Sequence, residues 1–312
     1  MSEPVLDLAI IGGGPAALSA ALYATRAGLK VTVFEKQSFG GTLTEISHLA
    51  NYPGFNGPGA ELATALKEQA KSAGAKLEYG TCESISTRGD AAGGTPTARN
   101  AREHVGGGEA DRTRVLTLDI DGETILARAV LVATGSEPTK LDLDTSKPVS
   151  YCALCDAPLY KGKNILVIGG GNSAVGEATY LADIAKHVTL INRSPLRAEP
   201  SLQSALRAKP NVEIHENTNP TPDLLGQADG IFVFIGKQPA SSFMPPATLG
   251  TDGYIKTDDN FMTVVPGLFA AGDVREGAVR QAITASAEGA AAAISVSNYL
   301  KKPPQIKSSR LS

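Results

Sequence analysis

The sequence lacks the features that mark several large classes of protein. No apolar run in its 312 residues approaches the roughly 18 to 20 residues that a helix needs to cross a bilayer. Residues 1–4 lead directly into a short apolar strand rather than a cleavable leader. The 29 basic and 32 acidic residues nearly balance, and no basic stripe interleaved with aromatic side chains indicates nucleic-acid binding. We therefore expect a cytoplasmic protein with neither a membrane nor nucleic acid as a partner.

Cysteine is also scarce, which excludes a scaffold held together by disulfides. Two of the three cysteines form the CxxC motif of Cys152 and Cys155, and Asp156 follows as a candidate proton donor or acceptor. Such a pair in a reducing compartment is typical of a catalytic redox disulfide. The alternative is half of a zinc site, but the four histidines are scattered along the sequence, so we predict no metal. Cys82 stands alone and is interpreted as an ordinary half-buried thiol.

The first conspicuous motif is a strand, residues 5–11, that runs into a glycine turn and then a helix. The turn fits the pattern GxGxxA, in which Gly12 permits the tight bend and Gly14 lets the backbone approach a pyrophosphate. The next strand ends in Glu35, 21 residues beyond Gly14, where an acid can bind ribose hydroxyls. Together these features predict a dinucleotide site.

A second strand, turn and helix repeats this arrangement. Gly169 and Gly171 lie 157 residues beyond Gly12 and Gly14, and the strand that follows keeps the same offset. Such register over a whole βαβ beginning predicts two dinucleotide-binding domains.

The two motifs differ at the ribose position, where Glu35 is replaced by Asn192. Arg193 follows directly and Arg197 lies four residues further on. Loss of the acid and gain of two cations favour a 2′-phosphate, and hence NADPH over NADH. The alternative is that both arginines are solvated surface residues.

The remaining elements are predicted from apolar runs and turn residues. Residues 88–114 have little to bury and are predicted to form a flexible surface excursion, and residues 301–312 a loosely ordered tail. A proline-containing turn is predicted at residues 218–222. The predicted strands are 115–119 and 124–127, forming a hairpin, then 129–135, 211–215, 230–236 and 267–273, and the predicted helices are 18–27, 59–73 and 280–299.

With these segments placed, the sequence resembles the low-molecular-weight thioredoxin reductase family nearly end to end. The resemblance is carried by the motifs GGGPAALSAALYATRAG, GGTLT, ANYPGF, ATGSEP, YCALCD, GGGNSAVGEA, VVPGLFAAGDV and RQAITASAEG. It implies an α/β fold with two Rossmann-like dinucleotide-binding domains. The FAD-binding domain would be discontinuous, residues 1–139 and 240–312, with a smaller pyridine-nucleotide domain, residues 140–239, inserted and carrying the CxxC motif. It also implies a homodimer, and hinges near Glu137–Pro138 and Gly236–Lys237.

The resemblance assigns roles to individual residues. Cys155 would face the flavin, Cys152 would attack the disulfide of a thioredoxin-like protein or small disulfide substrate, and Asp156 would serve as acid and base. The expected FAD-binding residues are Gly12, Gly14, Pro15, Ala16, Glu35, Lys36, Gly41, Thr42, Leu43, Asn51, Ala133, Thr134, Gly135, Asp273, Arg280, Gln281 and Ala282. The expected pyridine-nucleotide residues are Gly171, Ser173, Arg193 and Arg197.

Three departures from the family pattern fall in the pyridine-nucleotide half. Asn192 and Ser194 replace a His and an Arg of the 2′-phosphate motif, Gly176 stands where an acid is usual, and residues 215–230 are too few for the usual β-meander. Three functions therefore stay open. The first is an NADPH-dependent disulfide reductase. The second keeps the flavin and dithiol chemistry but takes electrons from another carrier such as ferredoxin, or runs as a dithiol oxidase with oxygen. The third is a non-catalytic FAD-binding module whose CxxC binds a metal.

Overall fold

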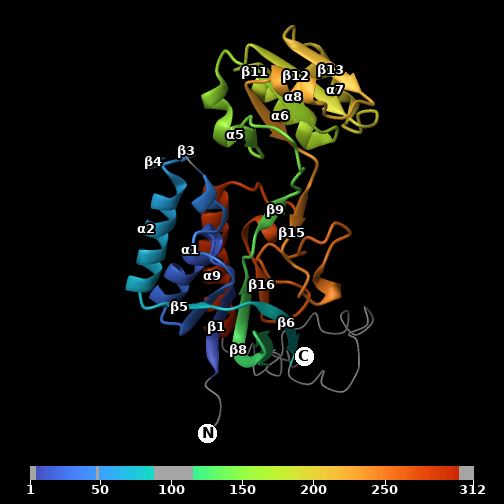
Figure 1. The fold of residues 1–312 in the computed structure, drawn as a ribbon. Coiled ribbons are helices and arrows are strands. Elements are labelled where there is room, and N and C mark those ends of the chain that lie inside the picture. Colours follow the sequence, from blue (N-terminus) through green and yellow to red (C-terminus); the bar gives the residue numbers. More distant parts are fainter. Residues whose placement is uncertain (1–4, 47–48, 88–114, 302–312) are drawn as a thin grey trace, which may run out of the picture. The chain divides into compact units, whose positions relative to one another are not determined.

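The computed structural model describes residues 5–46, 49–87 and 115–301. The predicted excursion at 88–114 and the predicted tail beyond residue 301 lie outside the described residues. Two compact units make up the chain (Figure 1). The first unit comprises Met1–Ser47, Tyr52–Ser136 and Pro239–Ser312, and the second comprises His48–Asn51 and Glu137–Gln238.

A seven-stranded sheet forms the centre of the first unit. Its strand order is β5-β2-β1-β8-β7-β6, and β16 also pairs with β8. The strands β5, β2, β1, β8 and β16 are parallel, whereas β7 and β6 extend the sheet in antiparallel fashion. The bounds are β1 Leu6–Ile11, β2 Val31–Glu35, β5 Lys76–Tyr79, β6 Cys82–Thr87, β7 Leu116–Ile120, β8 Glu123–Val132 and β16 Leu268–Ala270.

Helices and short turns complete this unit. A small separate sheet is formed by β3 and β4. The bounds are α1 Pro15–Arg26, α2 Gly59–Ser72, α9 Ala282–Lys301 and β4 Phe55–Gly57, with 3-10 helices η1 Gly41–Glu45, η3 Pro246–Thr248 and η4 Gly272–Val274. The strand β3 is Leu49–Tyr52, and its residues 49–51 are counted with the second unit.

Helices α1 and α9 pack together unusually closely, because small residues line both. A Cβ atom added to Gly289 of α9 would overlap the carbonyl oxygen of Ala16 and lie 2.7 Å from its carbonyl carbon. Ala17 and Ala20 of α1 and Ala292 of α9 are fully buried in the same core. The α9 helix is 20 residues long, yet neither it nor any other helix in the described ranges has the length and apolar character to span a membrane.

The strand β8 corrects the predicted pattern of two separate strands, 124–127 and 129–135. One ten-residue strand, Glu123–Val132, covers the first range and the start of the second, pairing with β7 along its first half and with β16 along its second. The polar residue between the two ranges, Arg128, does not mark a turn. Its guanidinium reaches the neighbouring β1, where it donates to Asp7 at 2.9 Å.

Asp7 is expected to make the stability of this unit depend on pH. Burial alone would raise the pKa of Asp7, but hydrogen bonds from the Lys30 amide and the Arg128 guanidinium outweigh it and lower this pKa below 3.8. A depressed folded-state pKa gives stability that is present above the unfolded-state pKa and is lost as pH falls through the folded-state value. Asp7→Asn should therefore reduce the free energy of unfolding by about 1 kcal/mol or less at pH 7. The loss should shrink below about pH 4. Urea unfolding at several pH values measures this, with exposed Asp252→Asn as control; a loss independent of pH would contradict it.

The second unit is built on a parallel five-stranded sheet. Its strand order is β10-β14-β11-β12-β13, and every pairing is parallel. The strand bounds are β10 Val149–Ser150, β11 Asn164–Ile168, β12 His187–Asn192, β13 Val212–Glu216 and β14 Gly230–Val233. The helix bounds are α5 Ala153–Asp156, α6 Asn172–Ala182, α7 Pro200–Arg207 and α8 Pro222–Gln227, with the 3-10 helix η2 Ala157–Tyr160.

Two prolines in this unit, Pro200 and Pro222, lie at the start of helices and not only in turns. Pro200 and Pro222 each stand in the first turn of a helix, where a missing N–H costs nothing. The predicted turn at 218–222 thus ends as the start of α8, where the Thr221 hydroxyl accepts from the Leu224 amide at 3.4 Å. The interval between β13 and β14 therefore holds a helical crossover.

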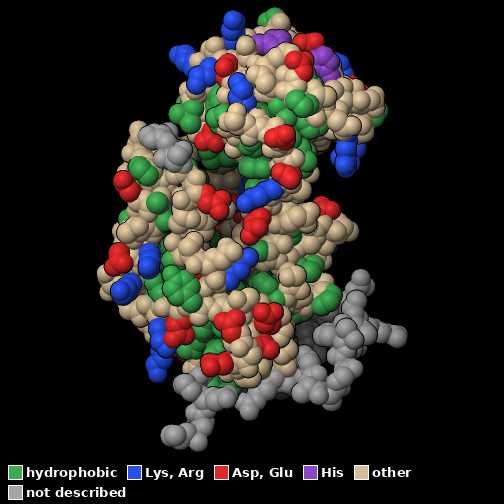
Figure 2. Space-filling view, in the orientation of Figure 1, with side chains coloured by type: hydrophobic (Ala, Val, Ile, Leu, Met, Phe, Trp, Pro, Cys, Tyr) green, Lys and Arg blue, Asp and Glu red, His purple; other side chains and the backbone are tan. Residues whose placement is uncertain are grey.

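Two histidines that are far apart in the sequence, His187 and His215, lie close together in this unit. On the adjacent strands β12 and β13, His187 and His215 approach the same carboxylate, with Nε2 atoms 3.7 and 3.0 Å from Glu213 oxygens. The histidine side chains lie on the surface of this unit (Figure 2). Among the described residues, however, no group of three or more His, Cys, Asp and Glu side chains could hold a metal ion.

Two short strands, β9 Ser136–Pro138 and β15 Lys237–Pro239, carry the chain from the first unit to the second and back. They pair with each other, and the Thr139 amide donates to the Gly236 carbonyl at 2.9 Å. Gly236 has a φ of 120°, which favours glycine. The two crossings of the chain therefore run side by side.

Candidate functional site

The first glycine turn lies at the carboxyl end of β1, as the sequence predicts. Gly12 has a φ of 104°, and a Cβ there would lie 2.5 Å from the Ala133 carbonyl oxygen at the end of β8, so only glycine fits. Around Gly14 no described heavy atom lies within 4 Å of the position a Cβ would take. The backbone at the start of α1 therefore faces open space, where amides and the helix dipole can receive a pyrophosphate.

Glu35 lies against this turn from the end of β2. Its side chain is 8% exposed, and Oε1 accepts hydrogen bonds from the amides of Gln37 and Ser38 at 2.8 and 3.3 Å. A Cβ on Gly13 would lie 3.0 Å from the other oxygen, Oε2. The carboxylate is thus held beside the glycine turn, as a ribose-binding acid requires.

The loop after β2 returns to the same turn. The Gly40 amide donates to the Gly13 carbonyl at 2.8 Å, and a Cβ on Gly41 would lie 3.3 Å from the Gly14 Cα. This contact places η1 beside the open space, with Thr42 exposed and Leu43 buried.

Two other parallel strands end at this edge of the sheet. The Ala133 amide donates to Ile11 and the Ala271 amide to Val132, at 2.8 and 3.0 Å, so the ends of β1, β8 and β16 are joined. Asp273 follows β16 in η4, and the Thr134 hydroxyl donates to the Ala240 carbonyl at 2.6 Å. The structure therefore brings the turn, residues 133–135 and Asp273 to one edge, where ligands of parallel sheets bind.

Glu288 is a residue at this edge that the sequence did not reveal. Its Oε2 accepts from the Gly272 amide at 2.8 Å and from Arg275 Nε at 3.0 Å. Arg275 in turn donates to the Thr257 hydroxyl at 2.7 Å. Glu288 sits within an alanine-rich helix, 16 residues from Gly272, so no local pattern could have identified this brace on the η4 turn.

The start of α9 offers a further set of donors. Arg280 adopts a φ of 59°, and its guanidinium stacks over Tyr254 with its Cζ 4.5 Å from the ring centroid. Its Nε is buried and has no hydrogen-bond partner among the described residues. Gln281 precedes the helix and Ala282 begins it. An orphaned donor beside a helix N-terminus, together with the open space at Gly14, fits an oxygen-rich, anionic cofactor such as FAD.

Two further predicted FAD residues lie outside the glycine turn itself. Asn51 belongs to β3, in the separate β3–β4 sheet, and Lys36 follows Glu35 with an exposed side chain. Pro15 and Ala16, by contrast, are the first residues of α1, directly after the open turn.

The second glycine turn reproduces the backbone of the first. Gly169 has a φ of 145°, and a Cβ there would overlap the Phe234 carbonyl oxygen just beyond β14. Gly171 precedes α6 with φ and ψ of −91° and −179°, against −76° and −174° for Gly14 before α1. No described heavy atom lies within 4 Å of its would-be Cβ, and Ser173 stands exposed in the first turn of α6.

Asn192 occupies the ribose position of this second turn. Its side chain is 8% exposed, and Nδ2 donates to the carbonyls of Ser194 and Pro195 at 2.7 and 3.3 Å. Asn192 therefore fastens the following loop, much as Glu35 does in the first unit.

The fastened loop carries the two candidate phosphate ligands. The Arg197 amide donates to the Gly170 carbonyl at 2.8 Å, the same contact that Gly40 makes with Gly13. The backbone of Arg197 is thus held on the glycine turn, and the side chains of Arg193 and Arg197 are both exposed.

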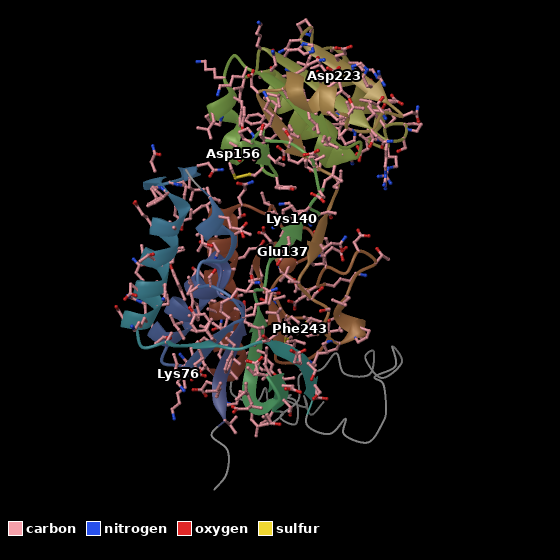
Figure 3. The ribbon with its side chains drawn as sticks, viewed as in Figure 1. Lys76, Glu137, Lys140, Asp156, Asp223 and Phe243 are labelled. Carbon is pink, nitrogen blue, oxygen red and sulfur yellow. A yellow bond between two sulfur atoms is a disulfide. The ribbon has the colours of Figure 1, made fainter. Side chains whose placement is uncertain are left out.

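The CxxC motif forms a disulfide at the start of the short helix α5 (Figure 3). Cys152 is the residue before the helix, and its Sγ accepts a hydrogen bond from the Cys155 amide at 3.2 Å. Such an amide stabilises a thiolate at Cys152 when the disulfide is reduced.

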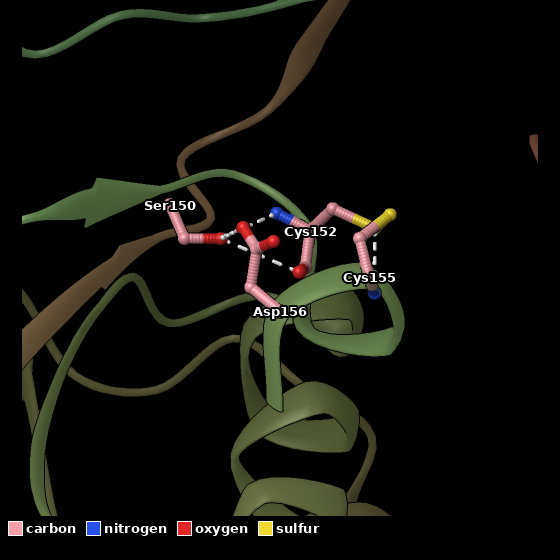
Figure 4. The surroundings of a disulfide bond; sticks show 4 residues. All are labelled: Ser150, Cys152, Cys155 and Asp156. Atoms are coloured by element: carbon pink, nitrogen blue, oxygen red, sulfur yellow. Dashed lines mark hydrogen bonds between the residues drawn. A yellow bond between two sulfur atoms is a disulfide. The ribbon is translucent and has the colours of Figure 1, made fainter. Parts of the chain in front are cut away.

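Asp156 is held in place by Ser150, a second residue that the sequence analysis missed. The Ser150 hydroxyl donates to Asp156 Oδ2 at 2.7 Å and accepts from the Cys152 amide at 3.2 Å (Figure 4). Serine two residues before a CxxC carries no signal by itself, because hydroxyl residues are common in loops. The structure thus confines disulfide, carboxylate and hydroxyl to one end of β10.

Cys82 is buried rather than half-buried, with 8% exposure in β6. Burial, outweighing a hydrogen bond to the Ser84 carbonyl, raises the pKa of this thiol to about 12. A buried protonated thiol neither exchanges nor alkylates readily.

We therefore expect thiol labelling to distinguish the three cysteines. Iodoacetamide at pH 7 should modify no cysteine in the oxidised protein and two, Cys152 and Cys155, after reduction with dithiothreitol. Peptide mass spectrometry locates the labels, and the same reaction in guanidinium chloride should add Cys82. Rapid labelling of Cys82 in the folded protein would contradict its burial.

Comparisons with known proteins agree on one family. The family model described as pyridine nucleotide-disulphide oxidoreductase matches residues 6–289. Thioredoxin reductases of Ureaplasma parvum and Bacillus subtilis are each 35% identical to the chain, covering 97% and 96% of it and 99% and 96% of their own lengths. The crystal structure of thioredoxin reductase from Streptococcus pyogenes superimposes with a TM-score of 0.81 at 30% identity, covering 96% of this chain and 99% of its own.

Proposed function

Because the chain belongs to the low-molecular-weight thioredoxin reductase family and is therefore an FAD-dependent disulfide oxidoreductase, we propose that it passes electrons from NADPH through FAD to the Cys152–Cys155 disulfide. The final acceptor is the disulfide of a thioredoxin-like protein or a small disulfide. The observation that carries the proposal is a CxxC disulfide, with its carboxylate, in a unit that also holds a second dinucleotide turn.

We assign FAD to the first unit, in the discontinuous domain predicted as residues 1–139 and 240–312. The open turn at Gly14, the acid Glu35, residues 41–43 and 133–135, Asp273 and the start of α9 would hold it. When bound, FAD supplies the two-electron transfer that links a nucleotide to a pair of thiols. The protein's own part is to bind the phosphates at the N-terminus of α1 and to offer donors such as Arg280 to the remaining oxygens.

Within the CxxC, we assign attack on the substrate disulfide to Cys152 and the flavin-facing role to Cys155. The amide of Cys155 points at Cys152 Sγ and favours the thiolate there, as an attacking sulfur requires. Asp156 lies in the same helix and would take and return protons during exchange.

We assign NADPH to the second unit, in the inserted domain predicted as residues 140–239. The turn at Gly171 has the geometry of its FAD counterpart, Ser173 adds a hydroxyl, and Arg193 and Arg197 lie on the loop fastened to it. Exposed arginines next to a ribose position suit a 2′-phosphate. We also propose that the protein is a cytoplasmic homodimer; light scattering that gives a monomeric mass would contradict the dimer.

Anaerobic titration of the FAD-loaded protein with NADPH, NADH and dithiothreitol in parallel tests the donor. We expect NADPH to bleach the flavin absorbance at lower concentration than NADH. Arg197→Ala should raise the NADPH concentration needed to bleach the flavin about tenfold or more, the effect of losing one charge-assisted contact. The NADH concentration needed should not change. Arg207→Ala, which loses a surface pair with Glu216, is the control. If only dithiothreitol reduces the flavin, electrons enter from another carrier or flow from dithiol to oxygen.

A further inference from the structure

We propose that Ser150 is a positioning residue for disulfide exchange: it holds the Asp156 carboxylate beside Cys152, so that each proton passes between attacking and leaving sulfur. The inference rests on the proposed dithiol chemistry but not on the identity of the electron donor. The side chain is 5% exposed and closes β10, whose backbone pairs with β14 through Phe232.

The hydroxyl joins the two groups that must act together. A serine hydroxyl has one proton and two lone pairs. The proton goes to Asp156 Oδ2 at 2.7 Å, and one lone pair takes the Cys152 amide at 3.2 Å. A single buried atom therefore fixes the carboxylate relative to the backbone of the attacking cysteine.

The same hydroxyl can serve both charge states of Asp156. The Cys152 carbonyl oxygen lies 3.3 Å from Ser150 Oγ, as a second acceptor. When Asp156 carries a proton, the hydroxyl can turn to that carbonyl and accept from the carboxylic acid. All three partners then stay hydrogen-bonded in either state, so the site gains no unpaired buried donor.

In the described part of the chain, no Lys, Arg or His side chain forms an ion pair with Asp156. Burial, followed by the charge of Asp156, raises the pKa of the Tyr160 phenol in η2, so Tyr160 stays neutral. The Lys163 ammonium lies over the Tyr160 ring, 5.5 Å from the ring centroid. The Ser150 hydroxyl is thus the side-chain partner through which Asp156 is oriented.

Asp156 takes the proton of the Cys152 thiol, the thiolate attacks one sulfur of the substrate disulfide, and the departing substrate sulfur receives that proton. A bond from Cys152 to the substrate has formed and the substrate disulfide has broken. Cys155 then loses its proton by the same route and attacks Cys152 Sγ, which re-forms the protein disulfide and releases the second substrate thiol. Two electrons and two protons have passed from protein to substrate.

The experiment compares two disulfides that differ in their need for a proton. Full-length FAD-loaded protein is reduced with dithiothreitol, freed of it anaerobically, and mixed at pH 7 with oxidised glutathione or with 5,5′-dithiobis(2-nitrobenzoate). The aromatic thiolate leaves without a proton, whereas glutathione thiolate is basic. Ser150→Val should slow the glutathione reaction about ten- to a hundredfold, the range expected for misplacing an acid–base group. The aromatic reaction should slow several-fold less. Ser150→Thr, equal in size to valine, should restore both.

Double substitution provides the second criterion. If Ser150 acts through Asp156, the protein with Ser150→Val and Asp156→Asn should react no more slowly than Asp156→Asn alone. Thr221→Ala removes a cap of α8 in the same unit and controls for stability loss. Equal slowing of both disulfides, additive effects, or a threonine variant no faster than valine would overturn the proposal. Because reduction is chemical, failure of NADPH to reduce the flavin would leave this result intact and would reject only the donor.

Discussion

Replacement of Cys152 by serine is expected to lower disulfide turnover by at least about a thousandfold, since it removes the sulfur that we assign as the nucleophile toward the substrate. Steady-state reduction of a thioredoxin-like protein, followed with each candidate donor, measures this. A hydroxyl at this position cannot replace the thiolate, because its proton is held far more tightly than that of a thiol. Cys82→Ser is the matched control and should leave turnover within about twofold, because Cys82 lies buried in β6 of the other unit.

The roles of the two sulfurs can be separated with the same variants. Cys155→Ser also stops turnover but keeps the attacking thiol, so it should accumulate a mixed disulfide with the substrate, visible by intact mass spectrometry. Cys152→Ser should not. Stable trapping by Cys152→Ser alone would reverse the assignment of attacking and flavin-facing cysteines. Turnover undiminished in either variant would remove the dithiol from the reaction.

Gly289→Ala is expected to destabilise the first unit by about 2–3 kcal/mol, because its methyl group would overlap the backbone of Ala16 in α1. Alanine in a helix interior normally stabilises by about 0.5–1 kcal/mol relative to glycine, so the clash reverses the usual sign. The melting temperature should fall by roughly 5–10 °C. The amount of FAD that copurifies with the protein, measured by its absorbance, should fall as well, because α1 begins at the open turn and shifts with Ala16.

The same substitution at Gly176 is expected not to destabilise the protein, because a methyl group there meets no atoms from the rest of the described chain. Gly176 lies inside α6, and no described heavy atom approaches within 4 Å of the position that its Cβ would take. The variant should be as stable as the parent or more stable by about 0.5–1 kcal/mol. Differential scanning calorimetry of both variants provides the comparison. A Gly289→Ala protein as stable as Gly176→Ala would show that α1 and α9 separate freely, against the close packing described above.

The sequence predicts this fold well where local chemistry and tertiary contacts demand the same residues. Gly12 and Gly169 are needed both for their positive φ values and for the approach of a carbonyl oxygen from a neighbouring strand. Apolar strands buried on both faces, such as β1, stand out for the same reason.

Sequence-based prediction was wrong or silent where a contact with a residue distant in the sequence determines the conformation or role of a residue. Arg128 interrupts an apolar run, yet β8 continues through it because Asp7 on β1 accepts its guanidinium. Pro222 is a turn residue that instead opens α8 behind a threonine cap. Glu288 and Ser150 show the same limitation within the site, because each acts on a partner that sequence spacing does not identify.

The pairing of β9 with β15 also bears on how such a chain could be redesigned. The chain leaves the first unit along β9 and returns to it along the adjacent β15. If the intervening hundred or so residues were removed, a short linker could therefore join the two ends. Inserting such a segment leaves the strand order of the first unit's sheet unchanged. A synthetic chain that joins residue 136 to residue 239 through a few glycines would therefore be a natural starting point for grafting foreign redox modules.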